Sequence, residues 1–105
     1  MEAEVDEIRR RVLEAPAASV IANHGYGLFE LAAIHLSQQP PSLSEARLAI
    51  DALGAMVDAL RGQLGPDEQS LVDGVAQLRL AWVQLDSLPS SPAGDEAANA
   101  GGGEQ

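Results

Sequence analysis

The chain has 105 residues, which is enough for one domain, and it contains no cysteine, which excludes disulfides and thiolate metal sites. Sixteen carboxylate side chains outnumber six arginines, and the formal net charge is −10. A surface of this sign repels a polyanion at long range, so we expect no binding to nucleic acid.

Residues 1–15 predict a short amphipathic helix. Val5, Ile8 and Val12 recur at spacings of three and four residues, and side chains of opposite charge stand four residues apart around them. A helix of this length is marginal alone, so we expect it to dock on a surface. The acidic start of the chain is unlike the basic start of a secretory signal peptide, and we expect a cytoplasmic protein.

The second predicted helix, residues 17–38, is apolar around more than half of its circumference. Its most apolar stretch, residues 20–36, contains four polar residues and is too short and too polar to favour a membrane span. A lone three-helix bundle would leave one apolar side of this helix exposed to solvent, so we expect two copies of the chain to bury it against each other. The candidate interface residues are Val20, His24, Leu28, Phe29, Leu31, His35 and Leu36.

A third helix is predicted over residues 42–61, after Pro40 and Pro41. Ser42 and Glu45 have the spacing of a capping box, and Gly62 is placed to end the helix in the left-handed conformation. Apolar residues follow a three-four alternation that predicts the buried face: Leu43, Ala46, Ile50, Leu53, Val57 and Leu60.

The fourth predicted helix covers residues 66–86. Pro66 suits the first helical position, and Asp67 and Glu68 complement the helix dipole. Its apolar positions are Leu71, Val75, Leu78, Trp82 and Leu85. We therefore predict a small all-α bundle of three main helices plus a short N-terminal helix, forming one helical domain over residues 1–86. The Ser-, Pro- and Gly-rich residues 87–105 are typical of a disordered tail.

Residues 43–54 read Leu-Ser-Glu-Ala-Arg-Leu-Ala-Ile-Asp-Ala-Leu-Gly. This run resembles the central helix of the bacterial "domain of unknown function 1844" family, in which a Leu-x-Glu-Ala-Arg-x-x-Ile-Asp-x-Leu pattern is found. Similar features continue through Arg61–Leu64, Pro66–Glu68 and Leu78–Val83, and the resemblance covers about Val20 to Gln84. Residues 37–41 form a shorter connection than in the family. The resemblance implies a helical fold and no particular activity.

Residue patterns for chemistry are sparse. His24 and His35 lie eleven residues apart, about 16 Å along a helix, so one chain cannot bring both to one metal ion. The serines match no nucleophile motif, and we expect no cofactor and no catalysis. Our first hypothesis is a helical protein–protein interaction module that self-associates as a homodimer. The alternative is a small ligand-binding protein or enzyme with a pocket between helices near His24 and His35.

Overall fold

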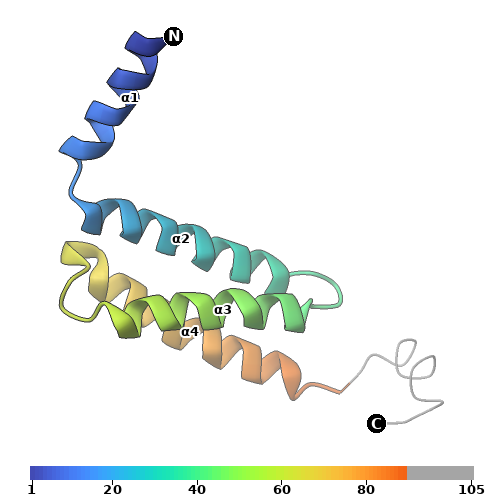
Figure 1. The fold of residues 1–105 in the computed structure, drawn as a ribbon. Coiled ribbons are helices and arrows are strands. Elements are labelled where there is room, and N and C mark those ends of the chain that lie inside the picture. Colours follow the sequence, from blue (N-terminus) through green and yellow to red (C-terminus); the bar gives the residue numbers. More distant parts are fainter. Residues whose placement is uncertain (90–105) are drawn as a thin grey trace.

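The computed structural model describes residues 1–89, in which all regular secondary structure is helical (Figure 1). The elements are α1 (Glu2–Glu14), α2 (Ala17–Leu36), α3 (Leu43–Ala59), the 3-10 turn η1 (Gly65–Asp67) and α4 (Glu68–Asp86). The predicted all-α architecture of three main helices and a short N-terminal one is confirmed. The predicted disordered tail lies outside the described residues from position 90 onward.

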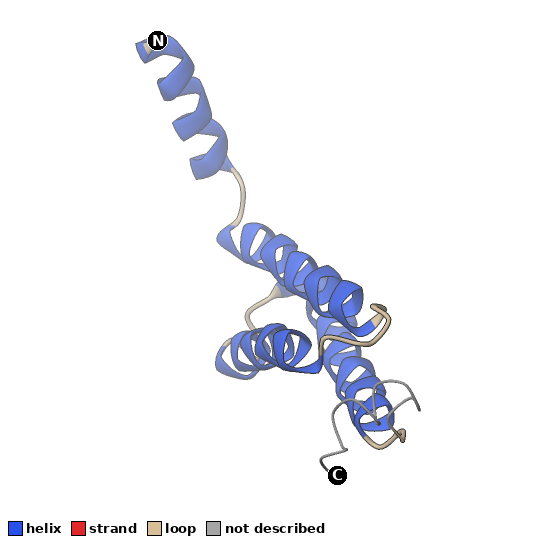
Figure 2. Cartoon of the chain, turned by 90° about the vertical axis from the view of Figure 1, so that its right-hand side faces the viewer, coloured by secondary structure: helices blue, strands red, loops and turns tan. Residues whose placement is uncertain are grey.

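The three main helices form a bundle in which each packs against the other two (Figure 2). Both predicted apolar faces point inward: Leu53 on α3 and Leu71 on α4 are among the largest fully buried side chains. Burying a leucine contributes about 1.5–3 kcal/mol relative to leaving it exposed. The buried core comprises Ala22, Ala32, Leu36, Ala46, Ala49, Ile50, Leu53, Val57, Leu64, Leu71, Val75 and Leu78.

Two glycines let α2 lie close to the other helices. A methyl group at Gly25 would come within 3.2 Å of Leu71 and 3.4 Å of Leu53, and one at Gly74 on α4 would come within 3.0 Å of the Phe29 ring. These helix-interior glycines cost helix propensity, but they allow side chains of the opposing helix to fill the space. They therefore set how closely α2 packs on its neighbours.

The predicted capping box at the start of α3 is wrong. Ser42 is the N-cap residue, but its side chain makes no capping hydrogen bond. Its backbone N–H donates instead to the carbonyl of His35 at 3.0 Å and closes the turn between α2 and α3. Because this N–H is already used, Glu45 has no free amide to accept from at that position, and the reciprocal bond of a capping box is lost.

The turn between α3 and α4 is held by a carboxylate that belongs to α4. Glu68 accepts hydrogen bonds from the backbone N–H groups of Gly62, at 2.8 Å, and Leu64, at 3.0 Å. Gly62 has the predicted left-handed conformation, with φ of 79°. Because Gly65–Asp67 form a 3-10 turn, α4 begins at Glu68, two residues later than predicted.

The N-terminal helix α1 projects away from the bundle (Figure 1). It has no buried residue and makes no close backbone approach to another described helix, so within one chain the expected docking does not occur. Pro16 disfavours a helical conformation for Ala15, which is extended and separates α1 from α2.

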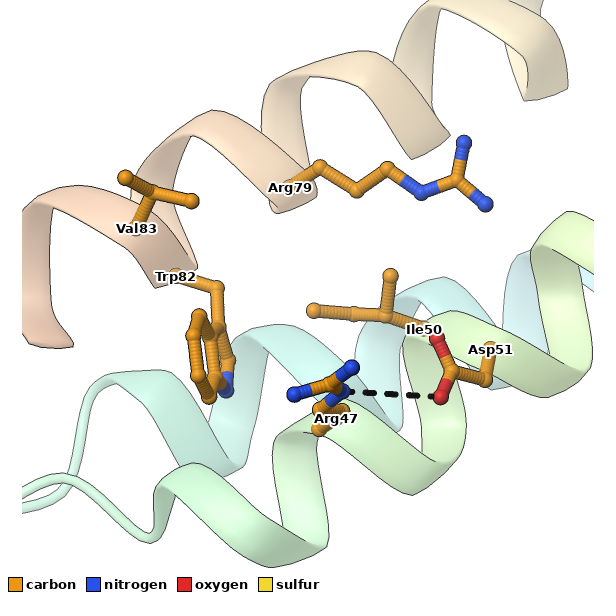
Figure 3. Close-up of a pocket in the computed structure, with 6 residues that line it drawn as sticks. All are labelled: Arg47, Ile50, Asp51, Arg79, Trp82 and Val83. Carbon is orange, nitrogen blue, oxygen red and sulfur yellow. Dashed lines mark ion pairs between the residues drawn. The ribbon is translucent and has the colours of Figure 1, made fainter.

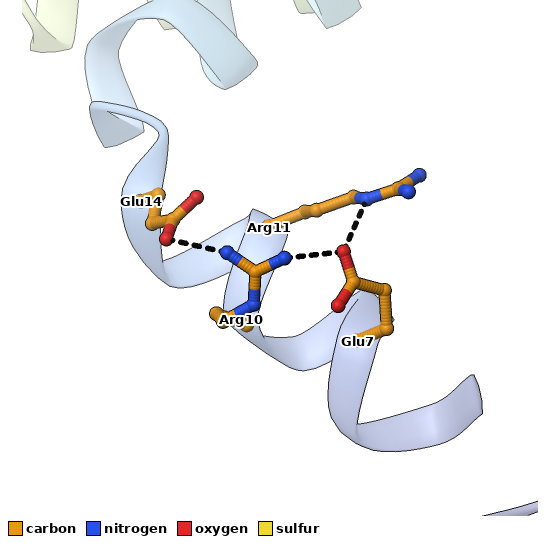
Figure 4. Close-up of polar contacts among 4 residues, drawn as sticks. All are labelled: Glu7, Arg10, Arg11 and Glu14. Carbon is orange, nitrogen blue, oxygen red and sulfur yellow. Dashed lines mark hydrogen bonds and ion pairs between the residues drawn. The ribbon is translucent and has the colours of Figure 1, made fainter. Parts of the chain in front are cut away.

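Ion pairs run along one side of α1 (Figure 4). Arg10 bonds to Glu7 and, at 2.8 Å, to Glu14, while Arg11 bonds to Glu7 at 3.0 Å. Exposed pairs of this kind are weakened by the surrounding water, so they support the helix locally without docking it on the bundle.

Candidate functional site

The side of α2 that faces away from α3 and α4 carries an exposed row of mostly apolar residues. We call this row the outer face of α2; its members are Ala17, Val20, His24, Gly27, Leu31 and Ile34. Val20, Leu31 and Ile34 are 38%, 46% and 57% exposed. Spacings alternate between three and four residues, which is the pattern of a coiled-coil contact line and places all six on one side of the helix.

The outer face of α2 lacks charge. Glu30 is the one carboxylate between residues 17 and 36, and no arginine occurs there, whereas the whole chain carries −10. An apolar, uncharged strip on a strongly charged protein is typical of an interaction surface.

Gly27 lies in the middle of this face, and the packing of residues 1–89 does not require glycine there. A methyl group built on it would meet nothing within 4 Å in the described part of the chain, in contrast to Gly25 two residues earlier. Glycine in a helix interior costs about 1 kcal/mol relative to alanine. The contacts of the single chain therefore offer no compensation for glycine at this position.

The predicted interface residues are divided between the two sides of α2. Val20, His24 and Leu31 are exposed on the outer face. Leu28 and Phe29 pack partly against the core, His35 is half-buried, and Leu36 is buried within the chain, so its side chain is not available to a partner.

Ile34, Gly27 and Ala17 belong to the outer face and were missing from the sequence prediction. The three-four spacing of this row in the sequence does indicate that these residues share one side of the helix. This indication was hidden because α2 is apolar on both sides, and the sequence does not say which side the bundle covers.

The histidines do not define a pocket. His24 is exposed on the outer face of α2. His35 is half-buried near the C-terminal end of α2, and its backbone carbonyl accepts a hydrogen bond from the Ser42 amide. Four surface hollows of residues 1–89 are lined by other residues. The histidine-centred pocket of the ligand-binding hypothesis therefore gains no support from these hollows.

A shallow groove of about 290 Å³ lies between α3 and α4 (Figure 3). Arg47 and Asp51 form an ion pair of 3.7 Å on its α3 side, and Trp82 and Arg79 come from α4. The Arg79 guanidinium makes no ion pair with a described carboxylate and lies over Gly54, at 2.3 Å from where a methyl group there would be. Two guanidinium groups beside an indole can hold an anionic or planar group.

Trp82 has a structural role at this groove. Its indole N–H donates to the carbonyl of Leu43 at 2.8 Å, and the Arg47 guanidinium lies 5.3 Å from the ring centroid. The bond ties the last part of α4 to the first turn of α3, and the cation–π contact adds about 0.5–1 kcal/mol at an exposed site.

Within residues 1–89 we find no cluster of three ligating side chains that could hold a metal ion. The helices of this part of the chain are also too short or too polar to span a membrane.

The protein is thus a three-helix bundle with a projecting N-terminal helix and an exposed apolar face on α2. Comparisons with family models, curated proteins and solved structures found no match to this chain. The resemblance to the "domain of unknown function 1844" family stays a prediction from the residues that carry it.

Proposed function

We propose that this chain is a helical protein–protein interaction module that self-associates through the outer face of α2. The observation that carries the proposal is the exposed row on that helix, with Val20, Leu31 and Ile34 at coiled-coil spacing and no charge among them. A monomer would keep this apolar surface in water, whereas a second helix with the same spacing would bury it.

The projecting helix α1 supports an assembly role. Val5, Ile8 and Val12 are all exposed and lie on one side of a helix that contacts no other described element. An isolated helix of 13 residues is marginal in water. A helix of this kind gains stability when its apolar side is covered by a partner, so both surfaces point to protein–protein contact.

We place the module in the cytoplasm, where a chain without cysteine needs no disulfide for stability.

Light scattering or sedimentation equilibrium tests the proposal. A single helix-on-helix contact belongs to the small class of interfaces, below about 1,200 Å² in total, so the protein should be measured up to several hundred micromolar. We expect a mass that rises with concentration toward twice the chain mass of 10.9 kDa. A mass that stays at one chain over this range would refute self-association.

Replacing Leu31 by Glu tests where the contact lies. The substitution puts an unpaired charge into the proposed interface, so we expect the association constant to fall by at least about tenfold, since burying such a charge is costly. Leu31 is exposed in the single chain, so its folding should be unaffected. The matched control is Leu48→Glu on α3, where an exposed leucine (69%) lies outside the outer face of α2. Equal effects of the two variants would place the contact elsewhere.

A further inference from the structure

We infer that two copies of the chain pair their α2 helices antiparallel, with His24 of each copy packed over Gly27 of the other. The inference rests on the proposed function and specifies the partner, its direction and its register. It starts from the six residues of the outer face of α2, whose spacings of 3, 4, 3, 4 and 3 residues extend along nearly the whole helix.

The register follows from the symmetry of a dimer of identical helices. An antiparallel pair has a two-fold axis across the helices, and the midpoint of the six positions falls between residues 25 and 26. About that point Ala17 faces Ile34 of the second copy, Val20 faces Leu31, and His24 faces Gly27. All six positions are then used. Shifting the register by one heptad leaves residues at both ends of the face without a partner and keeps apolar surface in water.

Side-chain sizes fit this direction. In two of the three kinds of layer a large residue meets a smaller one: isoleucine meets alanine at the ends of the series, and the imidazole meets glycine at its centre, with valine facing leucine between them. Since a methyl group at Gly27 would touch nothing within residues 1–89 of its own chain, the space above it is open there to a histidine ring from the second copy. A parallel pair would instead place His24 on His24 and Gly27 on Gly27, which crowds one layer and leaves a void in the next.

Charges favour the same direction. In the antiparallel pair the carboxylate of Glu30 lies beside Asn23 of the second copy, whereas a parallel in-register pair brings like residues to the same height. The two α1 helices also leave from opposite ends. Each α1 carries five carboxylates and three arginines, so keeping them apart avoids repulsion between two net-negative helices. Antiparallel helix dipoles add a favourable term.

Cysteine cross-linking tests the direction and the register, because the natural chain has no cysteine. Val20→Cys and Leu31→Cys chains are prepared separately, mixed, and treated with a short bismaleimide. We expect a covalent dimer in the mixture and none from either variant alone, since the two copies of position 20 lie about 16 Å apart along the helix axis in this register. Cross-linking of a single variant would indicate a parallel pair and overturn the inference.

A wild-type dimer whose mixed variants do not cross-link would overturn the register and leave self-association standing. A wild type that is monomeric at every concentration would overturn both. The two failures are therefore distinguishable, because light scattering reports the first proposal and the cross-link pattern reports the second.

A size exchange provides an independent test at the central layer. Gly27→Leu should lower the association constant about tenfold or more, since overpacking a filled layer costs that much, while the single chain still folds because its own structure leaves the position open. Adding His24→Ala should restore most of the loss, because leucine then faces alanine. The same double variant in a parallel pair would face Leu with Leu and Ala with Ala. Failure of the second substitution to restore association would contradict the His24–Gly27 layer.

Discussion

Gly25 and Gly27 lie two residues apart on α2 and have opposite surroundings. A methyl group at Gly25 would press on Leu71, whereas one at Gly27 would meet no atom of the described residues within 4 Å. Under monomeric conditions, Gly27→Ala should raise the free energy of unfolding by about 0.5–1 kcal/mol through helix propensity.

Gly25→Ala is the matched control, because it changes propensity equally but must displace the Leu71 side chain, 3.2 Å from the added methyl group, by a few tenths of an ångström. We expect it to be less stable than Gly27→Ala by about 1 kcal/mol. Urea denaturation at low protein concentration measures both. Identical stabilities would show that the packing of α2 is looser than these distances indicate.

Glu68 gives the stability of the protein a dependence on pH. Its pKa is lowered chiefly by the hydrogen bond from the Gly62 amide and then by that from the Leu64 amide, because both favour the charged carboxylate. A group whose folded-state pKa is depressed stabilises the protein above its unfolded-state pKa and loses that effect as pH falls through the folded-state value.

The difference in stability between wild type and Glu68→Ala should therefore be largest near neutral pH and should shrink on acidification below about pH 4.5, the ordinary value for a glutamate. Thermal melting of both proteins from pH 7 to pH 3 measures this. Glu68→Gln keeps a neutral acceptor and should show a smaller loss that depends less on pH. A gap that widened at low pH would mean that the turn does not rely on the charged carboxylate.

Leu53 and Leu78 test the register of α3 and α4. Both are buried at the centre of their helices, so replacing either by alanine should destabilise the protein by about 2–5 kcal/mol. Leu48→Ala and Leu80→Ala provide exposed controls on the same two helices and should stay within about 0.5 kcal/mol. Chemical denaturation of the four variants gives the comparison, and equal losses at buried and exposed positions would contradict the bundle.

At the scale of the element, α1 behaves as an attachment to the bundle. Because it makes no close backbone approach to α2, α3 or α4, deleting residues 2–15 should leave the melting temperature of the monomeric bundle within about 3 °C. Circular dichroism should show a loss of helical signal no larger than that of a complete α1, and an otherwise unchanged transition. A drop much larger than this would indicate that α1 covers apolar surface of its own chain.

The helices that the sequence predicts correctly are those with a single apolar side, because one periodicity of apolar residues then identifies the side that is buried. α3 and α4 each have one apolar side, so Leu53, Val57, Leu71 and Leu78 were correctly placed in the core. The capping box failed because the Ser42 amide is used by a carbonyl of the preceding helix, a contact set by the turn rather than by local spacing. Local patterns do not report such long-range competition for a hydrogen bond.

The candidate site was only partly predictable for the same reason. α2 is apolar on two sides, and periodicity alone does not say which side the other helices cover. Phe29 and Leu36 therefore looked as suitable for an interface as Val20 and Leu31, and the packing of the bundle separates them. The α3–α4 groove joins Arg47 to Trp82 across 35 residues of chain, so no local pattern could have indicated it.

At the scale of the whole molecule, the charge of −10 and the apolar faces have complementary effects. Negative charge tends to keep copies of the chain apart, and the proposed contact uses the outer face of α2, which carries no carboxylate and no arginine. In the proposed antiparallel pair the bundles would lie on opposite sides of the joined α2 helices, and the projecting α1 helices would extend from the two ends. Their exposed Val5, Ile8 and Val12 remain open to further protein contacts.

The single tryptophan can serve as an intrinsic fluorescent probe of the folding of the bundle. Trp82 is fixed to the Leu43 carbonyl where α4 meets α3, and it lies on neither α1 nor the outer face of α2. Its fluorescence should therefore change when these two helix ends separate during unfolding. It should not change if two copies of the chain associate through α2. A concentration series followed by fluorescence alone would therefore miss the proposed dimer, whereas the same signal would give the unfolding transition of the bundle without interference from association.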